Sequence, residues 1–368
     1  MPEYIELHAH SYYSLLDGTS SPEMLVQTAS LLGMSALALT DHDNLYGAVR
    51  FAKVADAHGI KPIFGAELTL EDHTHLTVLV RNERGWANLC ALITAGQHNA
   101  PKGHSSLPYD TLAQHADGLI CLTGCKHGYI AEALMQGDTH NAQNMLTQLR
   151  EWFGTDHVWV ELQHHHLPRD DARNRYLVAF ARLHRAGIVA TNNVHYAHRR
   201  EHRLQDVLTC IRHNTTLEDA GSRLRPNSEY YLKSGDELAH LFPTQALSNT
   251  LVIAEQCNFT LDYGLQDLPV FPTPQGITTE NYLHRLCYNS PRFRYPERVE
   301  SELQVIINAG LANYFLVVWD IVRYAREQGI RCQGRGSAAN SLVAYLLGIS
   351  PINPVAHVLC RNADKYTG

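Results

Sequence analysis

Histidines at the ends of short apolar segments are the residues of this chain with the clearest potential for chemistry. His8 and His10 form a His-x-His pair, and His42 follows a second apolar segment. Because alternate side chains of a strand point to one side, His8 and His10 can present two imidazoles to the same metal ion. Further along the chain lie candidates of the same kind: Asp17, Glu67, His75, Cys125 and His195. Such a set predicts a metal-dependent, hydrolase-like domain.

The alternative for each of these histidines is a buried ring whose nitrogens bond to the backbone. Three histidines at predicted strand ends, with carboxylates available, favour metal binding over that alternative. Mixed imidazole and carboxylate ligands suit zinc or manganese better than calcium, and the number of candidates implies more than one ion. Adjacent ions could bind a phosphate ester and generate hydroxide for its hydrolysis.

Two further features allow more than one interpretation. Cys125 is either a small core residue, as free cysteines commonly are, or a thiolate ligand at a strand end. His164, His165 and His166 form a run, but adjacent side chains diverge and do not easily share one ion. We therefore expect these three to be surface histidines.

Seven apolar, β-rich segments, most of them separated by helical stretches, are expected to position these side chains. They are residues 4–7, 36–40, 62–70, 76–80, 118–123, 158–162 and 188–191. The alternation predicts an α/β fold, either a layered sheet or a parallel barrel slightly smaller than the eightfold one. In parallel barrels chemistry gathers at the carboxyl ends of the strands, where most of the candidates fall. His75 instead precedes its strand, which an antiparallel hairpin through residues 71–74 would explain.

The composition excludes several classes of protein. With 368 residues, 45% of them hydrophobic, the chain can build two domains or a barrel with an extension. Its net charge of -7 gives no global attraction to phosphate backbones, so nucleic-acid contacts would need local basic patches. The eight cysteines are scattered, which argues against disulfides. No apolar run approaches the roughly 18 residues of a membrane span, so we expect a cytoplasmic protein without membrane contact.

The second half of the chain has a different pattern. Residues 191–267 become helical, and a proline-rich stretch from Leu268 to Gly276 marks a domain boundary. Helices are expected over residues 280–286, 298–309 and 314–328. The segment Gly334-Arg335-Gly336-Ser337 then opens a predicted helix and could cradle a triphosphate, although an ordinary helix start is the alternative.

Several motifs together resemble the bacterial C-family DNA polymerases, specifically the error-prone type of damage-induced translesion synthesis, which is similar to the replicative DNA polymerase III alpha subunit. The motifs extend over nearly the whole chain: ELHAHS from Glu6, ALTDHD from Ala38, PIFGAEL from Pro62, HLTVL from His75, DVLTCIRH from Asp206, YFLVVWDIV from Tyr314 and CQGRGSAANS from Cys332.

The resemblance implies a fold, a division into domains and a set of ligands. Residues 1–267 would form a polymerase and histidinol phosphatase (PHP) domain, a seven-stranded distorted barrel. Residues 268–278 would be a linker, and residues 279–368 the truncated start of a mostly helical, nucleotidyltransferase-like palm. Two or three zinc or manganese ions would be held by His8, His10, Asp17, His42, Glu67, His75, Cys125, Asn193 and His195. Asn193 stands where the family usually has aspartate, and its neutral amide is the poorer ligand.

In the palm of such polymerases, Gly334, Arg335, Gly336 and Ser337 would bind nucleotide phosphates. The catalytic aspartates, which hold magnesium, would lie farther along the chain. After Ser337 the only carboxylate is Asp364, and the family pattern stops after residues 353–357. We therefore expect a frameshifted or prematurely stopped gene whose product does not polymerise by itself.

The resemblance also implies a function. A family member would extend DNA primer-templates across lesions with deoxynucleoside triphosphates and translesion accessory proteins, in DNA repair and replication. The alternatives for this chain are a metal-dependent phosphoesterase or 3′-5′ exonuclease, and a non-catalytic scaffold.

Overall fold

The computed structural model describes residues 3–262 and 269–356. The chain divides into two compact units, Met1–Asp262 and Tyr263–Gly368, each of which is described by itself. The predicted boundary at residue 267 lies outside the described residues, as do Asp364 and residues 357–368.

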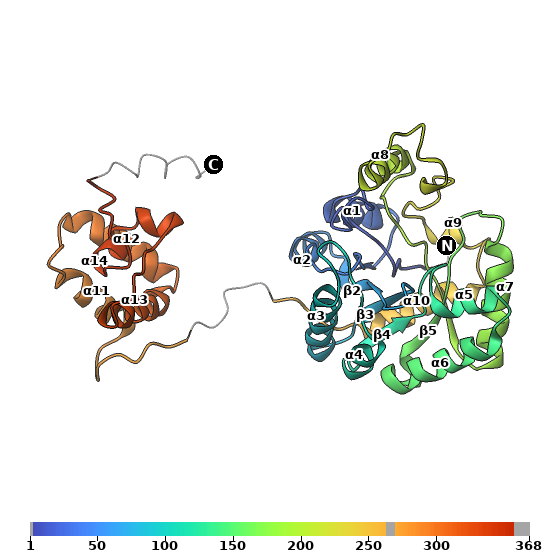
Figure 1. The fold of residues 1–368 in the computed structure, drawn as a ribbon, viewed down its shortest axis with the longest axis horizontal. Coiled ribbons are helices and arrows are strands. Elements are labelled where there is room, and N and C mark those ends of the chain that lie inside the picture. The colour runs from blue at the N-terminus through green and yellow to red at the C-terminus, as the bar shows by residue number, and fades with distance from the viewer. Residues whose placement is uncertain (1–2, 263–268, 357–368) are drawn as a thin grey trace. The chain divides into compact units, whose positions relative to one another are not determined.

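The first unit is an α/β fold built on a curled, six-stranded sheet (Figure 1). The strands follow one another in sequence order across the sheet. Strand β1 is parallel to β2, the pairs β2–β3 and β3–β4 are antiparallel, and the pairs β4–β5 and β5–β6 are parallel. Their bounds are β1 Ala36–Leu39, β2 Lys61–Thr69, β3 His75–Val80, β4 Leu119–Leu122, β5 Val158–Leu162 and β6 Gly187–Ala190.

The first of the seven predicted segments is not a regular strand. It runs beside β1, where Ala38 N donates to Glu6 O at 2.9 Å, and beside the chain after β6, where His10 N donates to Val194 O at 2.8 Å. It therefore bridges the two edges of the sheet. The Glu6 side chain accepts the backbone N–H of His8 at 2.9 Å and so removes a donor that a regular ladder would need.

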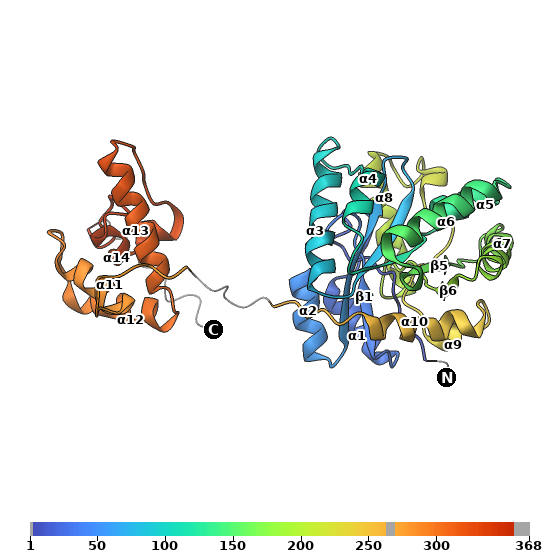
Figure 2. The same ribbon diagram turned by 90° about the horizontal axis from the view of Figure 1, so that it is seen from below.

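Helices flank this sheet (Figure 2). They are α1 Pro22–Leu31, α2 Ala48–Ala57, α3 Glu83–His98, α4 Tyr109–Gln114, α5 Tyr129–Met135, α6 Thr139–Phe153, α7 Asp170–Leu183, α8 His202–His213, α9 Gly235–Leu238 and α10 Thr244–Gln256, with short 3-10 turns at Thr155–His157, Arg199–Glu201 and Gly221–Arg223. Local signals set their ends: Ser21 caps α1 by accepting Met24 N, and Pro22 occupies its first turn.

The two faces of the sheet contribute to different cores. Alternate residues of β4 show this, because Leu119 and Cys121 pack in the large cluster with α1, α2, α3 and α6. Ile120 and Leu122 belong to a smaller cluster that includes Ile253 of α10. The period of two in a strand produces this division.

The expected hairpin between β2 and β3 is present. Glu67 pairs with Thr77 and Thr69 pairs with His75, so the amino end of β3 lies at the carboxyl end of β2. The turn passes through His73, which has a positive φ of 66°. His75 thereby reaches the same edge of the sheet as the other candidate ligands.

The second unit is helical in its described part. Its helices are α11 Thr279–Tyr288, α12 Pro296–Asn308, α13 Ala312–Glu327 and α14 Leu342–Leu346, with a 3-10 turn at Gly336–Asn340, and they enclose a separate apolar core. In the described part of the chain no single helix is long and apolar enough to cross a membrane. Only α12 and α13 taken together, bent by 112°, have that length and composition.

Candidate metal centre

The candidate ligands converge because the curled sheet brings several strand ends to one place. His42 follows β1 and makes an isolated parallel bridge with Glu67 of β2. Cys125 follows β4, and His195 follows β6. His10 reaches the group from the N-terminal segment, held by its backbone bond to Val194.

Glu67 lies at the middle of the cluster and is buried. Its Oε2 lies 2.8 Å from His8 Nε2 and 3.1 Å from His10 Nε2. Its Oε1 lies 2.5 Å from His75 Nδ1 and 3.4 Å from Cys125 Sγ. Two triads, His8–His10–Glu67 and Glu67–His75–Cys125, each have ligand atoms within 4.8 Å of one another. One carboxylate thus borders two possible ion positions.

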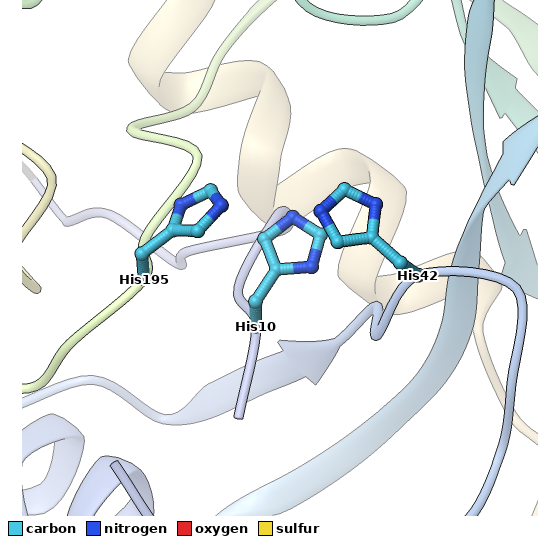
Figure 3. A group of neighbouring side chains, drawn as sticks. All are labelled: His10, His42 and His195. Carbon is cyan, nitrogen blue, oxygen red and sulfur yellow. The ribbon is translucent and has the colours of Figure 1, made fainter. Parts of the chain in front are cut away.

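A third group forms around His10, whose ring stacks on His42 with centroids 4.2 Å apart and lies 4.5 Å from that of His195 (Figure 3). Ligand atoms of these three histidines also lie within 4.8 Å of one another. Asp17 Oδ2 approaches His42 Nε2 at 3.3 Å and His195 Nε2 at 3.4 Å. The structure therefore brings Asp17 to the same group.

The charges in this cluster compensate one another. Burial alone would lower the pKa of His8, but Glu161 and Glu67 raise it to about 10. Burial alone would raise the pKa of Glu67, but His75 and His42 hold it well below its usual range. Burial and then Glu67 raise the pKa of the Cys125 thiol well above its usual range. Metal binding here would release protons, as expected when thiol and imidazole ligands take up an ion.

Unpaired electron-pair donors support the fit of this site to metal ions. Among the described residues, His195 Nε2 and Asn193 Oδ1 are buried without a hydrogen-bond partner. The other ring nitrogen of His195 lies 2.8 Å from Asn193 O, which leaves Nε2 facing the cluster. Nitrogen, oxygen and sulfur ligands together suit zinc or manganese. Asn193 is buried, has a φ of 44° and lines the same cavity as the histidines.

Five cationic side chains also line this cavity, whose volume is about 300 Å³. They are Lys126, Arg173, Arg212, Arg223 and Arg225. Arg225 Nη2 lies 3.1 Å from Asp17 Oδ1, and its guanidinium lies 4.3 Å from the centre of the Tyr230 ring. Burial and then the charge of Arg225 lower the pKa of Lys126. A cavity with these cations beside a metal centre suits an anionic ligand such as a phosphate ester.

Sequence reasoning missed Glu161 and the five cationic residues of the cavity, of which Arg225 is one. Glu161 is the charged residue of the otherwise apolar strand β5, and its carboxylate lies 2.7 Å from His8 Nδ1. A charged side chain inside a buried strand is a signal that could have identified it. Arg225 lies in an irregular segment after the turn at Gly221–Arg223, and we find no pattern in the sequence that identifies it.

The prediction of three surface histidines after β5 was wrong for two of them. His164 and His165 are buried, and only His166 is exposed. The His165 ring stacks on Tyr230 with centroids 3.8 Å apart, and its Nε2 lies 2.8 Å from Asn192 O. The segment around Asn227 and Tyr230 packs against the chain after β5, so histidines directly after this strand are covered.

The glycine-containing segment Gly334–Ser337 belongs to the second unit, and the candidate ligands belong to the first. Gly334 N donates to Ile349 O at 3.0 Å, and Arg335 is exposed. Gly336 has a φ of 64° and begins the 3-10 turn. A short turn rather than an α-helix therefore follows the glycines.

Comparisons with known proteins match both units. The PHP domain family matches residues 6–165, and the bacterial DNA polymerase III alpha NTPase domain family matches residues 277–362. An error-prone DNA polymerase of Mycobacterium bovis is 41% identical over 97% of this chain and 35% of its own length. One from Symbiobacterium thermophilum is 40% identical over 96% of this chain and 35% of its own length. The DNA polymerase III subunit alpha of Treponema pallidum is 37% identical over 97% of this chain and 33% of its own length. The chain thus spans about a third of the length of these relatives.

Proposed function

We propose that the first unit of this chain is a metal-dependent phosphoesterase. The premise is that the chain is a relative of the bacterial error-prone DNA polymerases, with a PHP domain and part of an alpha-subunit NTPase domain. The substrate class is a phosphate ester of a nucleotide or of a DNA 3′ end. The observation that carries this proposal is the convergence of three groups of ligand atoms, centred on Glu67 and His10, beside one cavity that Glu67, His42 and His195 line.

The first unit offers side chains that could bind metal ions and side chains that could bind the ester. The nine residues named by the resemblance would hold two or three zinc or manganese ions, which supply Lewis acidity and a hydroxide nucleophile when bound. Glu67 orders the imidazoles around it, and His195 is oriented by Asn193 O. Arg225 and Lys126 face the cavity and would bind the anionic oxygens of the ester. Glu67 and His195 are buried, and burial in a low-dielectric environment strengthens their electrostatic contacts.

For the protein as a whole, we propose a part in error-prone DNA synthesis at damaged templates in the cytoplasm. Its substrates would be primer-template DNA and deoxynucleoside triphosphates, with magnesium as the metal of polymerisation and translesion accessory proteins as partners. The support is the identity to error-prone DNA polymerases in both units. Gly334, Arg335, Gly336 and Ser337 would contribute contacts to the nucleotide phosphates. A non-catalytic scaffold is the alternative for the first unit, favoured by Asn193 in place of a carboxylate.

Elemental mass spectrometry of the purified chain tests the proposal for the first unit. We expect two or three zinc or manganese ions in the wild type and their loss in the double variant His8→Ala, His10→Ala. The variant His166→Ala removes an exposed histidine near the centre and is the matched control. Metal-loaded protein should then hydrolyse a 3′-terminal phosphodiester without any template. A wild type without stoichiometric metal would leave the scaffold as the function of this unit.

A further inference from the structure

We propose that Glu161 is a positioning residue of the metal centre, which fixes the tautomer and the orientation of His8. This inference rests on the proposed function of the first unit as a metal centre. Glu161 is not among the residues that the sequence motifs assign as ligands, and it lies behind His8, on the side of the ring away from Glu67.

The two nitrogens of the His8 ring each face a carboxylate. Nδ1 lies 2.7 Å from Glu161 Oε1, and Nε2 lies 2.8 Å from Glu67 Oε2. An ionised carboxylate only accepts hydrogen bonds, so the contact with Glu161 places a proton on Nδ1. By the same rule Nε2 donates to Glu67 when no ion is bound; once that proton is released to an incoming ion, the bond to Glu161 leaves the electron pair of His8 on Nε2, directed at the middle of the cluster. A metal ligand needs this tautomer.

Two further donors hold the Glu161 carboxylate in place. Thr191 Oγ1 donates to Oε1 at 2.5 Å, and Gln163 Nε2 donates to the same oxygen at 2.8 Å. With His8, three donors therefore meet at one oxygen, and the rotamer of Glu161 is fixed from the N-terminal segment, from the chain after β5 and from the end of β6.

The burial of Glu161 argues for a role beyond packing. Its side chain has no exposed surface, and its Oε2 has no hydrogen-bond partner among the described residues. Burying a carboxylate with one unpaired oxygen is costly, and an apolar residue like its strand neighbours Val160 and Leu162 would fill the position at less cost. The contact with His8 is the feature that an apolar residue could not supply.

The affinity of the full chain for zinc or manganese, measured by competition with a chromogenic chelator, tests this role of Glu161. Glu161→Gln keeps an acceptor oxygen for the donors of Thr191 and Gln163, removes the charge and places an amide NH2 where Oε2 lies. We expect metal affinity to fall about tenfold. Glu161→Met removes the acceptor as well, and we expect a loss of about a hundredfold, at the upper end of the usual range for such partners. Glu151→Gln, on the exposed side of α6, is the matched control.

A second variant covers the case in which changes at Glu161 prevent folding. Thr191→Val is nearly isosteric and removes the hydroxyl that donates to Glu161 Oε1, so we expect a severalfold loss of metal affinity with unchanged far-UV circular dichroism. Metal-free unfolding curves of each variant separate a loss of affinity from a loss of fold. Variants of Glu161 and Thr191 that fold and bind metal as tightly as the wild type would overturn the positioning role alone. A wild type that binds no metal would overturn the proposed metal centre, and this role with it.

Discussion

At the scale of single residues, Asn193 is the position where a change should strengthen the metal centre. Its Oδ1 is buried in the cavity without a hydrogen-bond partner among the described residues, and the amide is neutral. Asn193→Asp places a charged ligand at that point, so we expect metal affinity to rise about tenfold, or about 1.4 kcal/mol. Chelator competition measures this change.

Asn144→Asp, which adds the same charge on the exposed side of α6, is the control for a general electrostatic effect. An Asn193→Asp protein that binds metal no more tightly than the wild type would show that position 193 does not face an ion.

The residues of the centre were predictable to different degrees. His8 and His10 could be identified from the sequence because the period of two in an extended segment is a local property. The contact of Glu161 with His8 joins residues 153 positions apart, and local spacing carries no trace of such a pairing. His165 was misjudged because its burial depends on stacking with Tyr230, which comes from a distant irregular segment.

At the scale of elements, the close pairing of β2 and β3 depends on Gly65. A Cβ atom at this position would lie 2.3 Å from Val78 O, so Gly65→Ala forces the two strands apart next to Glu67. We expect a loss of about 3 kcal/mol in the free energy of unfolding, at the upper end for overpacking. Urea unfolding followed by circular dichroism measures it.

Gly33→Ala separates steric overlap from backbone strain. Gly33 has a φ of 74°, and a Cβ atom at this position would meet no other atom within 4 Å. Alanine there should therefore cost only the strain of the left-handed conformation, about 1 kcal/mol. Equal losses for the two variants would contradict the steric explanation.

Strand and helix positions followed from the sequence where a single pattern dominated. The β2–β3 hairpin was predictable because only four residues, 71–74, separate two apolar runs. The N-terminal segment did not form a regular strand because Glu6 turns its carboxylate onto the backbone of His8 and Asn192. Such competition by a buried side chain is decided by tertiary structure, and apolar spacing does not reveal it.

At the scale of the whole molecule, each unit has its own core. The large core of the first unit runs from Tyr4 to Leu247, and the core of the second is formed by the helices α11 to α14 with their neighbouring segments. All nine candidate ligands belong to the first unit. The metal centre and the segment that matches the polymerase NTPase domain are therefore carried by separately packed parts of the chain.

This separation predicts that residues 1–262, expressed alone, bind the same number of metal ions as the full chain. The fragment keeps every candidate ligand, the positioning contact of Glu161 and the cluster around α10. Its thermal unfolding midpoint should rise on metal addition, because an ion that binds only the folded state stabilises that state. Residues 269–368, tested in parallel, should bind no stoichiometric zinc or manganese. A fragment 1–262 that folds but leaves metal unbound, beside a full chain that retains it, would show that the centre needs the second unit.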